Sequence, residues 1–236
     1  MKKILMSAAC LAALGAAPAL AQDEGGESAW DISGTFGVVS DYKFRGFTQT
    51  DGDAAIQAGA TVSHDSGFYV GVWGSNVDFN DGETDFEVDF FVGYGGAIGE
   101  ATSWDVNLTY FSYPNAPDGS DYDYFEFGAG ITHDFGNGFT AGGKVAFTPE
   151  YFGDTGTAWW VGVNAGYAVT EWLSVSGNLG YQMLDDDFYF DDGYMHYDIG
   201  ATVTYGILNL DVRWVATDSD DPLGKDKVVG SAIFEF

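Results

Sequence analysis

The chain has 236 residues and a formal net charge of −28, which excludes nucleic acid as a partner and repels anionic surfaces. Disorder could also carry such a charge, but disordered chains are poor in aromatic residues, and here they make up 17% of the sequence. The charge must therefore lie on loops or on a wet interior around an ordered framework.

The first residues have the pattern of a secretory signal peptide. Two lysines precede an apolar run over 4–17, and a small-x-small cleavage site follows at 19–21. We expect a signal peptide over 1–21 and a short periplasmic segment over 22–29. Its cleavage would bring the charge to −30 and remove Cys10, the one cysteine. That loss would exclude disulfides, thiolate–metal sites and cysteine nucleophiles.

Alternation with a period of two residues dominates the rest of the chain and indicates half-buried strands. In 104–112, for example, Trp104, Val106 and Leu108 lie on one face, and Asp105 and Asn107 lie on the other. In 67–78 both faces carry apolar residues, so its lipid side is not assigned. The predicted strands cover 30–39, 55–64, 67–78, 85–97, 103–113, 123–133, 138–148, 158–169, 172–183, 194–205, 207–217 and 227–236.

The predicted connections alternate strictly between long and short. The long ones are 40–54, 79–84, 114–122, 149–157, 184–193 and 218–226, and each short one has about five residues or fewer. Bacterial outer-membrane barrels have short periplasmic turns and longer extracellular loops. A soluble β-sandwich, the alternative, has no reason to keep this alternation.

Aromatic residues at the ends of the predicted strands fit the two interfaces of a membrane. They include Trp30, Trp104, Tyr113, Trp159, Trp172 and Trp214. The sequence stops on Phe236, an aromatic end of the kind that the outer-membrane assembly machinery recognises. We therefore predict an all-β fold over 30–236, a transmembrane antiparallel up-and-down β-barrel of about twelve strands.

Four stretches resemble the TorF family, whose members are named as porins largely on their architecture. The most specific are SDYKFRGFTQ over 40–49 and HDSGFYVGVWGSNVDF over 64–79. The others are Glu87-Val88-Asp89 leading to Gly93-Tyr94, and Tyr113-Pro114. The resemblance covers 40–114 and implies an outer-membrane porin without a defined substrate.

The strand parity that turns apolar residues toward lipid turns charged residues inward, because charge on the lipid face is costly. Two interpretations stand: an electronegative channel for passive diffusion of small, preferentially cationic solutes, or a closed barrel in which these groups pair with each other. Neither requires a cofactor. The candidate pore-lining residues are Asp85, Glu87, Asp89, Asp105, Lys144, Asp198, Asp211 and Arg213.

The first long loop carries Lys43 and Arg45 and is a candidate constriction loop. One interpretation folds it inward, with Arg45 reaching acids such as Asp85 or Glu87. The other leaves an exposed loop held by local salt bridges of little energy.

Other chemistry has weaker support. Acidic clusters in the outer loops, such as the one at 185–187, could bind Ca²⁺ but do not have EF-hand spacing. The histidines offer one acid–base pair, His196 with Asp198 or Asp187, and no serine nucleophile accompanies it, so we do not expect an enzyme. The expected partners are membrane lipid and lipopolysaccharide, small solutes, and the barrel-assembly machinery through Phe236.

Overall fold

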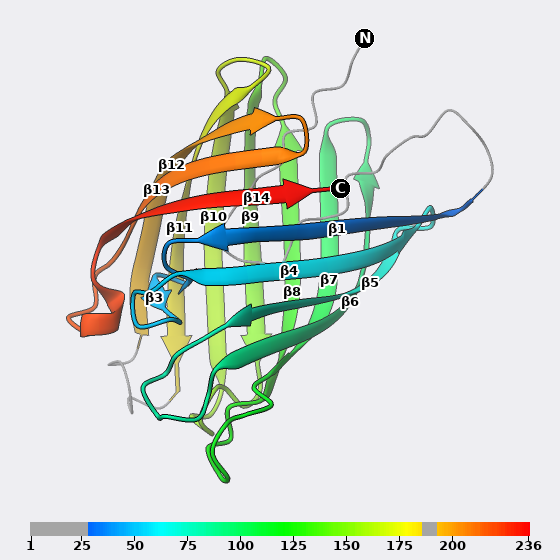
Figure 1. Ribbon diagram of the computed structural model, residues 1–236. Helices are drawn as coiled ribbons and strands as arrows, with labels where there is room; N and C mark the ends of the chain where they lie inside the picture. Colours follow the sequence, from blue (N-terminus) through cyan, green and yellow to red (C-terminus); the bar gives the residue numbers. More distant parts are fainter. Residues whose placement is uncertain (1–27, 186–192) are drawn as a thin grey trace.

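The computed structural model describes residues 28–185 and 193–236. The expected signal peptide, most of segment 22–29 and the acids Asp186 and Asp187 lie outside the described residues. The described part forms one closed antiparallel barrel of twelve strands (Figure 1). They are β1 (Trp30–Val39), β4 (Ala55–His64), β5 (Phe68–Asn76), β6 (Phe86–Ile98), β7 (Thr102–Ser112), β8 (Tyr124–Asp134), β9 (Phe139–Thr148), β10 (Ala158–Ala168), β11 (Leu173–Leu184), β12 (Gly193–Tyr205), β13 (Leu208–Thr217) and β14 (Lys227–Glu235).

The predicted fold class is confirmed, and each predicted strand is present within a few residues of its expected bounds. The short strands β2 (Lys43–Phe44) and β3 (Phe47–Thr48) add a hairpin inside the first long loop. The structure also assigns the faces of β5. Val70 and Val72 are exposed on the outer surface, whereas Tyr69 and Trp73 are buried toward the lumen.

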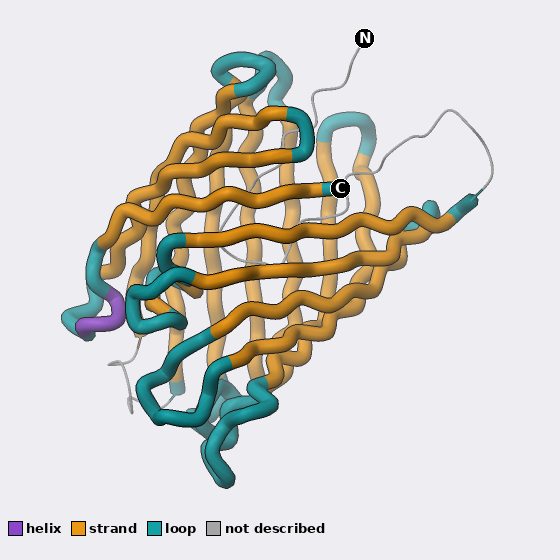
Figure 2. Tube along the Cα trace, in the orientation of Figure 1, coloured by secondary structure: helices purple, strands orange, loops and turns teal. Residues whose placement is uncertain are grey.

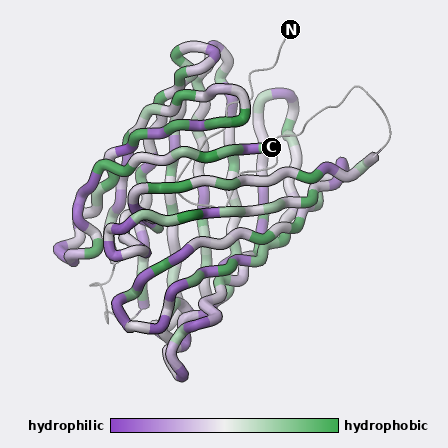
Figure 3. Tube along the Cα trace, in the orientation of Figure 1, coloured by the Kyte–Doolittle hydropathy of each residue, from purple (hydrophilic) through white to green (hydrophobic). Residues whose placement is uncertain are grey.

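Alternating side chains give the barrel an apolar exterior and a polar interior. Figure 3 shows how hydropathy varies from residue to residue along the nearer strands. Large apolar residues such as Ile32, Val163 and Ile199 are more than half exposed on the outside. Such exposure would be a liability in water, whereas a transmembrane barrel presents this surface to lipid.

Long and short connections gather at opposite ends of the barrel (Figure 2). We call these the long-loop end and the short-turn end. At the short-turn end, the turns rely on residues with positive φ, including Gly67, Asn137 and Gly206. The long loop 218–226 contains the 3-10 turn η1 (Pro222–Gly224). Among the described residues, no helix is long and apolar enough to cross a membrane.

The barrel closes where β1 pairs with β14. Thr35 lies opposite Glu235, and Gly34 and Phe236 exchange two backbone hydrogen bonds of 2.6 and 3.0 Å. The Phe236 ring is 69% exposed. Most of the strand-end aromatics are exposed as predicted, but Tyr113 is buried, because it packs into a cluster of aromatic loop residues at the long-loop end.

Several inward rings lie flat over glycines of the next strand. The Tyr69 ring covers Gly93, and its hydroxyl donates a 2.8 Å hydrogen bond to Asp105. Phe91 covers Gly71 in the same way. A Cβ atom added at Gly93 would lie 2.2 Å from the Tyr69 Cζ, so the ring keeps its place only because glycine has no side chain.

We therefore expect Gly93→Ala to displace the Tyr69 ring and to lower the free energy of unfolding by about 1–3 kcal/mol, a usual cost of overpacking. Urea unfolding of the protein refolded in lipid vesicles measures this. Gly143→Ala is the matched control, because its new methyl group would meet nothing closer than a carbonyl oxygen at 3.7 Å. Equal stability of the two variants would contradict the expectation.

Candidate functional site

The first long loop folds into the lumen at the long-loop end. We call residues 41–50, which contain β2 and β3, the inner hairpin. Every residue from Asp41 to Phe47 is buried. The turn between the two strands needs positive φ at Arg45 and Gly46, 47° and 91°. A Cβ at Gly46 would lie 2.3 Å from the Thr217 Cγ2, so glycine also allows this close approach to the barrel wall.

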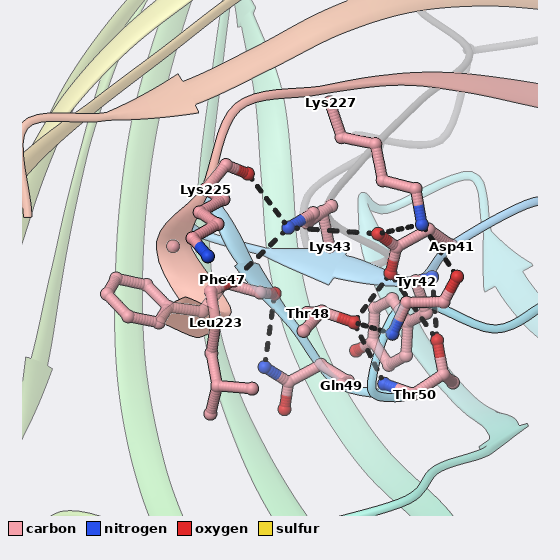
Figure 4. A network of polar contacts seen from close by, with 12 residues as sticks. Asp41, Tyr42, Lys43, Phe47, Thr48, Gln49, Thr50, Leu223, Lys225 and Lys227 are labelled. Atoms are coloured by element: carbon pink, nitrogen blue, oxygen red, sulfur yellow. Dashed lines mark hydrogen bonds and ion pairs between the residues drawn. The ribbon is translucent and has the colours of Figure 1, made fainter. Parts of the chain in front are cut away.

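The base of the inner hairpin is organised around the buried carboxylate of Asp41 (Figure 4). It forms ion pairs with Lys227 at 3.1 Å and with Lys43 at 3.7 Å, and it accepts a 2.6 Å hydrogen bond from the Thr48 hydroxyl. Lys43 also donates to the carbonyl oxygens of Leu223 and Lys225 in the last long loop. These contacts join the hairpin, which follows β1, to β14 and the loop before it, across the barrel seam.

The tip of the inner hairpin is held by Arg45. Its guanidinium donates to both carboxylate oxygens of Glu126 on β8, at 2.6 and 2.7 Å, and to the Gln182 side chain on β11 at 2.8 Å. The same guanidinium lies 5.0 Å from the centre of the Trp160 ring, within cation–π range. Arg45 therefore joins the hairpin tip to two strands of the wall, β8 and β11, which are separated by β9 and β10.

Of the two interpretations of this loop, the inward fold is the one observed, but the acid that Arg45 reaches is Glu126 and not Asp85 or Glu87. Asp85 is exposed in the connection before β6, where Asn115 donates to it at 2.6 Å. Glu87 is buried and accepts a 3.0 Å hydrogen bond from the Tyr113 hydroxyl instead. The hairpin directs Arg45 toward Glu126 on β8 and Gln182 on β11.

Aromatic residues of the long loops pack beside the inner hairpin. Phe79, Tyr113, Tyr122 and Phe152 come from three loops, and the Tyr122 and Phe152 rings stack at 4.2 Å between centres. Part of this group belongs to the same buried cluster as Tyr42 and Phe44 of the hairpin. The sequence reasoning missed this cluster, although the high aromatic content of these loops was a usable signal.

The two halves of the lumen differ in burial. Toward the long-loop end the inward side chains are buried under the inner hairpin. Toward the short-turn end many are only half buried, and they are small or polar: Gly59, Thr61, Gly128, Gly130, Thr132, Thr140, Asn164, Ser174 and Asn178. A half-buried polar wall is suited to contact with water, and we call this part of the lumen its wet half. On the β5, β7, β12 and β13 side of the same half, inward side chains are buried: Tyr69, Asp105, Thr202, Asn209, Asp211 and Arg213.

Most of the predicted pore-lining residues do face the interior, but several are paired there. Arg213 forms ion pairs with Asp198 and with Asp211, and it donates to Ser176. Asp105 accepts hydrogen bonds from Tyr69 and Asn107, and Lys144 lies within its electrostatic reach. Glu87 and Asp89 are buried on β6. Asp85 is the exception, because it is exposed outside the strand.

The alternative chemistry gains no support in the described part of the chain. His196 accepts a 2.8 Å hydrogen bond from Trp160, while Asp198 is paired with Arg213, so these two do not form an acid–base pair. Within residues 28–185 and 193–236, no group of three or more acidic, histidine or cysteine side chains is arranged to hold a metal ion.

We expect Arg45→Met to leave the buried Glu126 carboxylate without its cation. Breaking a buried ion pair in this way costs about 3–5 kcal/mol. The double variant with Glu126→Gln should recover part of that loss, because no buried charge is left. Urea unfolding in lipid vesicles tests this, and Lys225→Met, at an exposed position, is the control. Purely additive losses would show that the two side chains are not coupled.

The fold is similar to that of several solved outer-membrane proteins. The KdgM porin has a TM-score of 0.59 at 6% identity, and the match covers 86% of this chain and 98% of that one. The NanC porin has a TM-score of 0.56 at 8% identity, and the match covers 87% of this chain and 98% of that one. The COG4313 outer membrane channel from Pseudomonas putida F1 has a TM-score of 0.55 at 9% identity, and the match covers 90% of this chain and 98% of that one. At these identities the likeness shows the fold alone.

Comparison by sequence places the chain in one family. No curated protein matches the chain. One family model matches residues 23–232, which is most of the sequence, and its description is a bacterial protein of unknown function. The chain therefore belongs to this bacterial family, Gcw_chp.

Proposed function

We propose that this chain is a porin-like channel of the bacterial outer membrane that lets small solutes diffuse passively, with a preference for cations. The observation that carries the proposal is the wet half of the lumen. A closed structural barrel has no need for an inner wall of small, half-exposed polar residues, whereas a water-filled passage does. The resemblance to the TorF family and the likeness to porin barrels support the same function.

The balance of inward charge supports cation preference. Glu87, Asp89 and Asp105 face the lumen, and none of them forms an ion pair with another residue of 28–185 or 193–236. One solved structure of the KdgM porin is in complex with oligogalacturonate, an acidic sugar chain. Excess carboxylates would repel such an anion, so the solutes proposed here are neutral or cationic.

The inner hairpin would set the size limit of the passage, because it crosses the lumen and is held at both ends. The proposal includes no catalytic step and no cofactor. In an outer membrane, the apolar exterior would contact lipid and lipopolysaccharide, and the terminal strand ending in Phe236 would present the assembly signal.

A closed barrel that binds a partner or stabilises the envelope is the second candidate. The specific observation in its favour is the unbroken burial of Asp41 to Phe47, together with the aromatic cluster of the neighbouring loops. The two candidates differ in whether ions cross the folded barrel.

Planar-bilayer recordings of the refolded protein decide this, and we expect discrete conductance steps with cation selectivity. Neutralising Glu87, Asp89 and Asp105 together should lower the cation-to-anion permeability ratio, because charged side chains in a pore set its selectivity. The control neutralises Asp65, Asp118 and Glu171, three exposed acids outside the strands. Absence of conductance would refute the channel, and anion selectivity would refute the charge argument.

Removing the inner hairpin should widen the passage. Residues 42 and 49 are already joined by a 2.7 Å backbone hydrogen bond, so Asn-Gly in place of residues 43–48 can close a two-residue turn. We expect a severalfold higher conductance per channel in bilayer recordings. Unchanged conductance would show that the hairpin is not the constriction, and a silent barrel would support the closed alternative.

A further inference from the structure

Two carboxyl groups lie together beneath the inner hairpin. Glu87 and Asp89 are two residues apart on the inward face of β6 and are 2% and 0% exposed. Asp89 has Trp73 of β5 and Phe111 of β7 as its direct cross-strand neighbours. Tyr42 of the hairpin packs edge-on against Trp73 at 5.4 Å, so the hairpin covers the pair.

The hydrogen-bonding capacity of this pair is mostly unused. Tyr113 donates to one oxygen of Glu87, and the Tyr42 hydroxyl lies beside the same group. In the described part of the chain, the other Glu87 oxygen and both Asp89 oxygens have no hydrogen-bond donor. The nearby Thr109 is 2% exposed, and its hydroxyl also lacks a hydrogen-bond partner there.

Two ionised carboxylates are unstable in such a place. Withdrawing one carboxylate from water costs several kcal/mol, and nothing in the described part of the chain repays it with an ion pair. A second negative charge on the same strand face adds repulsion in a region of low dielectric constant. A proton bound by one member of the pair lessens both problems, since a neutral carboxyl group has less charge to bury and can itself donate a hydrogen bond.

We propose that Glu87 and Asp89 form a proton-binding pair that locks the inner hairpin in place. The pair keeps at least one proton while the hairpin covers it. When that proton passes to water at higher pH, the two carboxylates repel each other and become hydrated. The hairpin then separates from the inner face of β6 that it covers. The lock concerns the hairpin, and only its consequence for conduction rests on the proposed function.

Other titratable groups near the pair do not account for the same response. Glu126 of β8 faces Asp89, but Arg45 neutralises it. The remaining neighbours are phenols from the hairpin, the long loops and β8, which ordinarily ionise only near pH 10. They are Tyr42, Tyr113, Tyr124 and Tyr151. Below that pH, the two carboxyl groups are the members of this group that can change charge.

A metal ion is the competing way to stabilise the pair. The described residues bring no third acidic, histidine or cysteine ligand into position, whereas hard cations such as Ca²⁺ take six to eight oxygen ligands. A proton needs only the two carboxyl groups, and the geometry therefore points to a proton.

Hydrogen–deuterium exchange of the full protein in phosphatidylcholine vesicles tests the lock without relying on conductance. Exchange is followed between about pH 5 and pH 9 and corrected for the intrinsic rate, with residues 41–50 compared with β9. We expect protection of the hairpin to fall with rising pH, approaching tenfold per unit once the pair titrates, while β9 stays protected.

Asp89→Asn keeps the shape of the side chain but cannot ionise, so it should hold the hairpin protected up to the highest pH. Asp85→Asn, an exposed acid four residues earlier, is the matched control and should behave as wild type. Protection that is independent of pH in wild type, or equal loss in wild type and Asp89→Asn, would overturn the lock. Protection at high pH that depends on added Na⁺ or Ca²⁺ would overturn it in favour of a metal. A barrel that shows this pH response but no conductance would refute the proposed channel function and not the proton-dependent lock.

Discussion

Backbone hydrogen bonding is the constraint on which the rest of this structure depends. A sheet without edges pairs every strand on both sides, and in hydrocarbon only a helix or a closed sheet can achieve this. Once β1 pairs with β14, each strand has one face toward the outside and one toward the lumen. The outside can be apolar throughout, but the inside must find partners for the polar side chains directed into it. The inner hairpin and the pairs around Arg213 are two ways in which this chain meets that demand.

Charge inside the barrel is distributed unevenly around its wall. In the β12–β13 sector, Arg213 balances two aspartates, and across the lumen Arg45 balances Glu126. On β6, Glu87 and Asp89 lie under aromatic rings with no comparable partner in the described residues. Much of the cationic charge toward the long-loop end is thus supplied by a loop that enters the barrel. A loop that holds charge in this way affects both the packing of the lumen and its electrostatic potential.

The fold could be predicted from the sequence because its signals are local. Alternation within a strand and the contrast between long and short connections require no knowledge of distant contacts, and both were sufficient for twelve strands. The faces of β5 were not predictable in this way, because both carry apolar residues, and the burial of Trp73 depends on Tyr42 of the hairpin. The partner of Arg45 was also not predictable from the sequence, since Glu126 is 81 residues away and the contact between them depends on how the barrel closes. For the same reason, strand parity placed Glu87 and Asp89 inside but could not reveal which acids would lack donors.

The position of the inner hairpin has a consequence for the order of folding. It belongs to the beginning of the barrel, yet its contacts come from β8, β11, the loop before β14 and β14 itself. The longest of them joins Asp41 to Lys227, 186 residues later in the chain. Closing contacts of such long range is entropically costly and slow. Arg45 lacks its partners until β8 and β11 are in place, and Asp41 lacks Lys227 until β14 arrives, so the segment must stay hydrated until then. Seating of the hairpin is therefore a late event, and a nascent barrel passes through a stage in which its interior is more open than in the finished protein.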